Sequence, residues 1–137
     1  MQTFLPYRNY EDSAKVLDSV RLMNQRRESM SLITSIENNS GWINHPCAKM
    51  WTPYLYQLSL YSVYICIECL SRGFNDKCLS FFEDKLEIYR SNKTVPHWLG
   101  NKHLHLSHQS NLLRKDQKYY SKFFPGVVNF LPYYWPD

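Results

Sequence analysis

The feature that most constrains the fold is the apolar segment PCAKMWTPYLYQLSLYSVYICIECLSRGF, residues 46–74. Its apolar residues lie nearly all round a helical wheel, which is typical of a helix buried at the centre of a protein. Pro46 stands in the first turn, where proline is favoured, and Pro53 should bend or restart the helix. Gly73 should end it in the left-handed conformation. The segment predicts a central helix surrounded by other helices.

The rest of the chain has no alternation of apolar and polar residues of the kind that marks strands. A first helix is expected to begin where Asn9 or Asp12 can cap its free amides, and to run to about Glu37. Further helices are expected over residues 77–89 and 103–116.

The two ends of the chain are expected to be extended. MQTFLPY, residues 1–7, should pack onto the body, and FFPGVVNFLPYYWPD, residues 123–137, has three prolines and should lie over the helices. A chain of 137 residues suits one domain with one core. The prediction is an all-α fold, a compact single-domain bundle (residues 1–137) of three to four helices with extended N- and C-terminal segments.

The net charge of +4 permits a polyanionic partner without requiring one. Basic residues recur over residues 8–27 and 102–122, and a fold that joined these segments would suit a DNA duplex. A mild positive charge is also common in proteins that bind no DNA. The aromatic content of 16% serves both cores and base stacking, so it favours neither interpretation.

The four cysteines are Cys47, Cys66, Cys69 and Cys78. The pair in CIEC resembles a redox or zinc half-site, but its helical context and the lack of a second pair favour buried structural thiols. No signal peptide opens the chain, and no apolar stretch is long enough to span a bilayer. We expect free thiols, no membrane, and a cytoplasmic (nucleoid-associated) location, or a nuclear one for a virus of eukaryotes.

The stretch RLMNQRRES raises the question of a site. On a helical wheel the first helix has a polar face (Asp18, Arg21, Gln25, Glu28) opposite an apolar side (Val16, Val20, Met23, Met30). The polar face could be a solvated surface with weak ion pairs. It could also be a cleft where Glu28 handles protons while Arg21 and Arg26 hold phosphate.

Three histidines, His103, His105 and His108, lie within six residues, and the last two share a helix face. A metal site would usually add carboxylate or thiolate ligands, and none is close, so no metal is predicted. The segment SHQSNLLRK could contact phosphate, or its histidines could be ordinary core or surface residues.

No glycine-rich phosphate loop, nucleophile elbow or kinase-type motif is present. A lysine or the chain's own α-amine remains as a nucleophile. An α-amine has an intrinsic pKa of roughly 7.7–8.0, well below that of lysine, so a useful fraction is neutral and suits imine chemistry.

The segments LMNQRRES (22–29) and IECLSRGFN (67–75) resemble those of the pyrimidine-dimer DNA glycosylases, the phage T4 endonuclease V family. MQTFLPY, GWINHPCAKMW, PHWLG, SHQSNLLRKD and LPYYWP are similar to a branch of that family in bacteria and viruses. The similarity touches most of the chain and keeps its order.

The resemblance implies a helical domain that binds damaged double-stranded DNA, expected here as a monomer, with no cofactor. In this family the N-terminal amine attacks C1′ at the 5′ nucleotide of a cyclobutane dimer and displaces the base. An imine forms, and β-elimination cuts the strand on the 3′ side. A glutamate beside the amine assists. The DNA is kinked and a base opposite the lesion is flipped out.

Carried over by position, Glu28 takes the role of that glutamate, Arg27 precedes it as an arginine does in the family, and Arg21 replaces a histidine at the site. The wheel turns Arg27 toward the apolar side. The predicted catalytic residues are Met1, Gln2 and Glu28. The predicted DNA-binding residues are Arg21, Gln25, Arg26, Arg27, His45, His105, His108, Arg114 and Lys115.

The chain departs from the family pattern at its start. The phage enzyme exposes a threonine amine once its initiator methionine is removed, whereas here the second residue is Gln2. Methionine before a bulky glutamine is usually retained, and a freed glutamine can cyclise. The nucleophile is then the Met1 amine, or a lysine such as Lys15 substitutes, or lyase activity is weak.

Three rival functions stay open at this point. The same fold and imine chemistry could act on a different damaged or modified base. The chain could be a non-catalytic basic module that binds DNA, or a histidine-metal nuclease.

Overall fold

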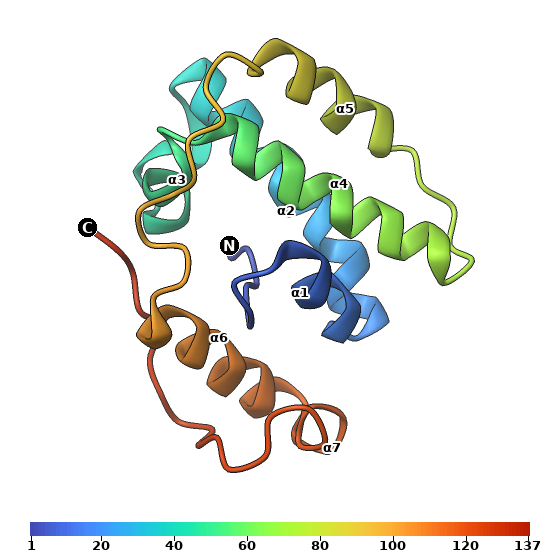
Figure 1. The fold of residues 1–137 in the computed structure, drawn as a ribbon, viewed down its shortest axis with the longest axis vertical. Helices are drawn as coiled ribbons and strands as arrows, with labels where there is room; N and C mark the ends of the chain where they lie inside the picture. Colours follow the sequence, from blue (N-terminus) through green and yellow to red (C-terminus); the bar gives the residue numbers. More distant parts are fainter.

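The structure is a computed structural model that describes residues 1–137. It is all-helical, with seven α-helices and one 3-10 helix (Figure 1). The all-α class is therefore confirmed, and the count of three to four helices is corrected to seven. The elements are α1 (Tyr10–Val16), α2 (Ser19–Asn38), η1 (Gly41–Asn44), α3 (Pro46–Trp51), α4 (Leu55–Ser71), α5 (Leu79–Ile88), α6 (Lys102–Lys115) and α7 (Gln117–Tyr120).

The first helix is not continuous, contrary to the prediction. Asn9 caps α1 as expected, but Leu17 and Asp18 are extended, with ψ of 138° and 155°. The Asp18 side chain accepts from the amide of Arg21 and starts α2 as its cap. Its own amide donates to the hydroxyl of Tyr120 at 2.9 Å. Aspartate is a favoured helix cap because its side chain binds the free amides of the first turn. The bond to Tyr120, a distant residue, holds Asp18 in the extended conformation that separates α1 from α2.

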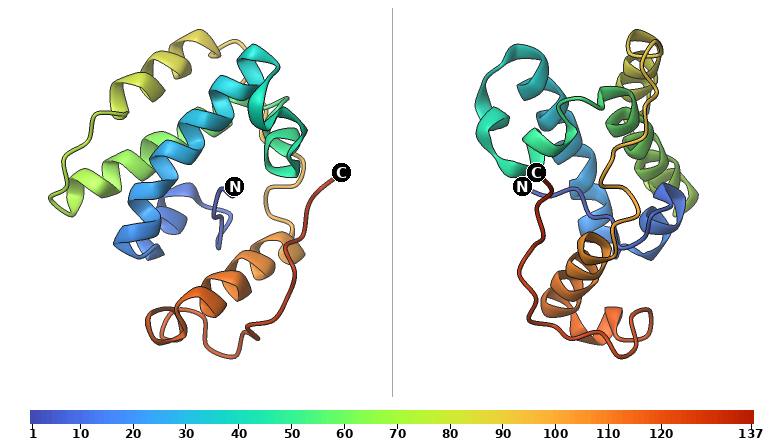
Figure 2. Two further views of the ribbon diagram at one scale, coloured as in Figure 1. Left: turned by 180° about the vertical axis from the view of Figure 1, so that it is seen from behind. Right: turned by 60° about the vertical axis from the view of Figure 1, so that its left-hand side comes forward.

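The central segment behaves as its prolines and glycine predict. Pro46 occupies the first turn of α3, Pro53 lies between α3 and α4, and Gly73 follows α4 with φ of 86°. Helix α4 contacts α1, α2 and α5, which gives it the central place expected (Figures 1 and 2). Cys66 and Cys69 of CIEC are fully buried in it, which confirms the prediction of buried thiols.

Arg72, which follows α4, connects this helix to the junction between α1 and α2. Its guanidinium pairs with Glu68 at 2.9 Å and donates to the carbonyls of Ala14 and Lys15 and to the Ser19 hydroxyl. Cations interact favourably with the free carbonyls at a helix end. The segment ECLSRGF therefore holds the N-terminal helices against α4.

Both chain ends lie outside the helices and pack on them, as predicted, but residues 123–126 of the tail form turns and are not extended. Residues 121–137 return along α6, where the amides of Leu131 and Tyr134 donate to Ser110 and Ser107. The tail ends near α3, where Trp135 meets the edge of His45 (Figure 2). No helix is both long and apolar enough to cross a membrane.

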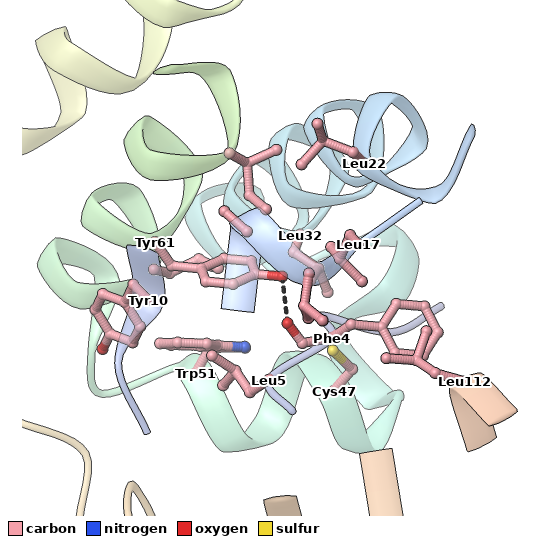
Figure 3. Packing of buried hydrophobic residues seen from close by; sticks show 14 of the residues in the cluster. Phe4, Leu5, Tyr10, Leu17, Leu22, Leu32, Cys47, Trp51, Tyr61 and Leu112 are labelled. Atoms are coloured by element: carbon pink, nitrogen blue, oxygen red, sulfur yellow. Dashed lines mark hydrogen bonds between the residues drawn. The ribbon is translucent and has the colours of Figure 1, made fainter. Parts of the chain in front are cut away.

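The start of the chain lies inside the fold. Phe4 and Leu5 belong to the hydrophobic core, together with Trp51, Tyr61 and Leu112 (Figure 3). The segment runs between the group formed by α2 and α4 and the separate helix α6 (Figures 1 and 2). We call residues 1–7 the N-terminal arm.

Candidate active site

Side chains from several helices bind the backbone of the N-terminal arm. The hydroxyl of Tyr61 on α4 donates to the carbonyl of Phe4 at 2.7 Å (Figure 3). The amide of Gln109 on α6 donates to the carbonyl of Pro6 at 2.8 Å. A buried extended segment without a neighbouring strand needs such partners, because its polar groups cannot reach water. These bonds hold the arm in one place.

Two histidines predicted as DNA contacts belong to this set. Nδ1 of His108 accepts from the amide of Leu5 at 2.8 Å, and Nδ1 of His105 forms a hydrogen bond with the carbonyl oxygen of Leu5, also at 2.8 Å. His105 also accepts from the amide of Gly100 through Nε2, so its Nδ1 carries the proton. Both rings are buried. The shared helix face was predicted correctly, but it faces the arm and not the surface.

Burial of His108 makes the attachment of the arm sensitive to acid. Desolvation, with the neighbouring His105, lowers the pKa of His108 to about 3. Below pH 6.5 the unfolded chain binds a proton that the folded protein excludes, so stability is complete above pH 6.5 and falls toward pH 3. At pH 5 we expect the free energy of unfolding to be lower than at pH 7 by about 2 kcal/mol.

Urea unfolding at pH 7 and pH 5 measures this difference. His108→Asn keeps an oxygen that can accept from Leu5 but cannot titrate, so its difference between the two pH values should be smaller. His103→Asn, at an exposed position, should keep the wild-type difference. Equal losses in all three proteins would contradict a role for His108.

The polar side chains of α2 do not form a face opposite the core, so the helical wheel was wrong. Val20, placed on the apolar side, is 63% exposed, whereas Gln25 is 1% exposed and Ser29 is fully buried. The reason is the arm, whose backbone packs on this face of α2 and requires hydrogen-bonding partners there. Gln25 supplies two of them, to Gln2 and Phe4.

Glu28, one turn after Gln25, is half-buried at the end of the arm. Its Oε2 accepts from the backbone amide of Gln2 at 3.3 Å. Beside it is an open pocket of about 390 Å³, lined by residues that include Met1, Gln2, Arg21, Glu28 and Lys115. The three residues predicted to be catalytic are thus brought together in one hollow.

The α-amine lies close to this carboxylate. Successive backbone nitrogens are at most about 3.6 Å apart, so the Met1 nitrogen is within about 7 Å of Oε2. Desolvation by burial lowers the pKa of His45, and the positive charge of the α-amine lowers it further. This charge also acts on Cys47, whose burial raises its pKa to about 11. His45 therefore lies near the amine, while its Nδ1 caps α3 by accepting from the amide of Cys47.

The pocket has a cation on each of two helices. Arg21 of α2 pairs with Asp18 at 3.2 Å, and Lys115 of α6 takes part in no ion pair. Arg114, next to Lys115, donates to the carbonyls of Asn129 and Leu131 in the tail. The two basic segments are therefore joined across the pocket by Arg21 and Lys115.

The two remaining arginines of RLMNQRRES have different environments. Arg26 pairs with the buried carboxylate of Asp76 at 2.8 Å and donates to the carbonyl of Asn75, so it ties α2 to the loop before α5. Arg27 is exposed and donates to Asn24 at 3.0 Å. The wheel directed Arg27 toward the core, but the structure directs it to solvent.

Lys15, the alternative nucleophile, lies elsewhere. It is exposed, pairs with Glu11 at 2.9 Å and lines a different hollow with Tyr7 and Phe123. The pocket also contains Tyr133 of the tail and Asn24, which sequence patterns did not single out. Tyr133 reaches the pocket through a tertiary contact of the tail, whereas Asn24 lies on the same face of α2 as Arg21 and Glu28. No group of three or more His, Cys, Asp or Glu residues is arranged to hold a metal ion.

Fold and site define an all-helical protein whose buried N-terminal arm brings the start of the chain to a carboxylate in a pocket flanked by cations. Residues 1–81 match the family model described as pyrimidine dimer DNA glycosylase, and the chain belongs to this family. Searches of curated proteins and of solved structures gave no match.

Proposed function

We propose that the protein is a DNA-repair glycosylase with AP-lyase activity on cyclobutane pyrimidine dimers in double-stranded DNA. The family supports the enzyme class and the type of lesion. One observation carries the mechanism: Oε2 of Glu28 lies 3.3 Å from the Gln2 nitrogen, beside the first residue of the chain. The Met1 amine is one residue nearer the start of the chain, within about 7 Å of this proton acceptor, and imine chemistry needs a proton acceptor near the attacking amine.

In the proposed reaction the neutral α-amine of Met1 attacks C1′ at the 5′ nucleotide of the dimer. The bond from C1′ to the base breaks, and the base leaves with the electron pair and gains a proton. Glu28 stabilises the positive charge on the sugar and accepts a proton from the attacking amine.

The strand is cut after the sugar ring opens. Breakage of the bond between C1′ and the ring oxygen gives an imine, and that oxygen becomes a hydroxyl. Loss of the C2′ proton then expels the 3′ phosphate, and water releases the enzyme by hydrolysing the imine. No metal or organic cofactor takes part in these steps.

The exposed cations supply the proposed contacts to the DNA backbone. Arg21 and Lys115 flank the pocket, and Arg27 lies further along α2 on the exposed side. Arg114, which adjoins Lys115 on α6, and His45, which caps α3, are further candidates. Phosphate contacts of this kind make affinity fall as salt rises, in proportion to the phosphates neutralised.

Borohydride trapping tests the proposal. The protein is incubated with duplex DNA carrying one dimer or one abasic site, and the imine is reduced to a stable bond. We expect a covalent adduct with both DNAs that a chelator does not remove. An adduct with abasic DNA but not with dimer DNA would point to a different base. No adduct with dimer, abasic or modified-base DNA would overturn the imine chemistry.

A further inference from the structure

We propose that Gln25 is a positioning residue that holds the start of the chain and Glu28 in one fixed arrangement. The inference rests on the proposed function, because it assigns a role in the same reaction. It replaces the predicted DNA contact of Gln25, since the side chain is 1% exposed and lies beneath the arm.

The side-chain amide of Gln25 binds the arm at two points. Its Oε1 accepts from the amide of Phe4 at 3.0 Å, and its Nε2 donates to the carbonyl of Gln2 at 2.7 Å. In an extended chain these two groups flank Thr3 and point the same way, toward the place that a partner strand would occupy. The side-chain amide of Gln25 thus makes the two hydrogen bonds that the backbone of a neighbouring strand would otherwise make.

This contact fixes the register of the arm. A slip of one residue along an extended segment turns every side chain and every backbone group to the opposite side. The amide of Gln25 can bind both Gln2 and Phe4 only in the present register. In this register the amide of Thr3 points away from Gln25 and donates to the side chain of Gln2 at 2.9 Å. Among the bonds that hold the arm, those of Gln25 therefore fix the setting of the residues next to Met1.

The same amide also reaches Glu28. Residues three apart on a helix are neighbours, and Nε2 of Gln25 lies 3.4 Å from Oε2 of Glu28. Because that oxygen also accepts from the amide of Gln2, the arm, Gln25 and Glu28 form a closed hydrogen-bonded ring. Gln25 thus links the start of the chain to the carboxylate, beside the direct bond between Gln2 and Glu28.

Gln109 offers a matched control. Its amide donates to the carbonyl of Pro6 at 2.8 Å, so it also holds the arm, but it has no bond to Glu28. Gln25→Met and Gln109→Met each remove an amide at nearly constant side-chain length. Gln25→Asn keeps an amide but shortens the side chain by one methylene, so that it cannot span the same groups. Because Gln25→Asn buries no new apolar surface, it tests the same role in a second variant that we expect to fold.

The experiment measures single-turnover borohydride trapping on abasic duplex DNA, with the rate at saturating DNA separated from Kd. Rates are expressed per folded molecule, from circular dichroism below the unfolding temperature of each variant. We expect both Gln25 variants to lose about 100-fold in saturated rate, the scale of a reacting group displaced by about 1 Å, with Kd unchanged. Gln109→Met should keep most of the wild-type rate.

A double-mutant cycle separates positioning from stability. If Gln25 acts through Glu28, adding Gln25→Met to Glu28→Gln should cost much less than Gln25→Met costs alone. Wild-type rates in both Gln25 variants, or equal losses in the Gln25 and Gln109 variants, would overturn this inference alone. A wild-type protein that formed no adduct would overturn the proposed function and this inference together.

Discussion

Glu28→Gln is expected to lose base release while the protein still binds damaged DNA. The two side chains have nearly the same shape, and the glutamine oxygen can still accept from the Gln2 amide that Glu28 now binds. What disappears is the negative charge that would stabilise the cationic sugar and the group that would take up a proton. Removing a positioned acid or base of this kind costs about 10²–10⁴-fold in rate.

The measurement is the single-turnover release of the 5′ glycosidic bond in dimer DNA, with Kd from titration of the same duplex. Glu87→Gln is the matched control, because Glu87 is an exposed carboxylate on α5 outside the pocket. Its rate should equal that of the wild type. Parallel losses of affinity and rate in Glu28→Gln would instead make Glu28 a structural residue.

Local rules predicted the boundaries that depend on a few neighbouring residues. Asn9 caps a helix, Pro53 separates two helices, and Gly73 adopts a positive φ, each for reasons contained within one turn of chain. The break before α2 is different. Asp18 could cap a helix or lie within one, and the choice is fixed by Tyr120, which is 102 residues away. No local pattern contains that contact.

The face of α2 was misread for a related reason. Helical periodicity assumes that the interior is apolar, so it assigned Gln25 to the surface and Val20 to the core. Here the interior face meets the backbone of the arm, and buried backbone groups require polar partners. Gln25, His105 and His108 are buried because they bind that backbone. The polar residues in the interior are therefore a consequence of the buried extended segment, whose backbone they bind.

The candidate site was predictable to the extent that it rests on the family resemblance. Met1, Gln2, Arg21 and Glu28 were proposed together from matched motifs, and they line one pocket. The catalytic roles stay predictions that the experiments above test. The spacing of RLMNQRRES alone did not separate its arginines, because Arg26 is tied down by Asp76, which lies 50 residues further along the chain.

Placing Gly–Ser ahead of Met1 is expected to abolish borohydride trapping. From Gln2 onward the arm is held by Glu28, Gln25 and Tyr61, so it cannot slide to make room for two more residues. The new amine would lie up to about 7 Å further along the chain and out of reach of C1′. Loss of a fixed attacking geometry should lower the rate by at least about 100-fold.

The same dipeptide added after Asp137 is the control, and it should leave the rate of trapping unchanged. Undiminished trapping by the N-terminally extended protein would mean that a side chain forms the imine. Lys115 is then the residue to replace, since it lines the pocket, whereas Lys15 lies at a different hollow. Lys115→Arg would keep the positive charge and remove the nucleophile.

Mass mapping of the reduced adduct identifies the reacting nitrogen. We expect the sugar on the α-amine of Met1, because methionine before glutamine is usually retained and Met1 lines the pocket. An adduct on Gln2 would mean that Met1 is removed and that the nitrogen now bound by Glu28 at 3.3 Å becomes the free amine. Because the arm keeps its register in both cases, the two outcomes differ only in which nitrogen faces the carboxylate.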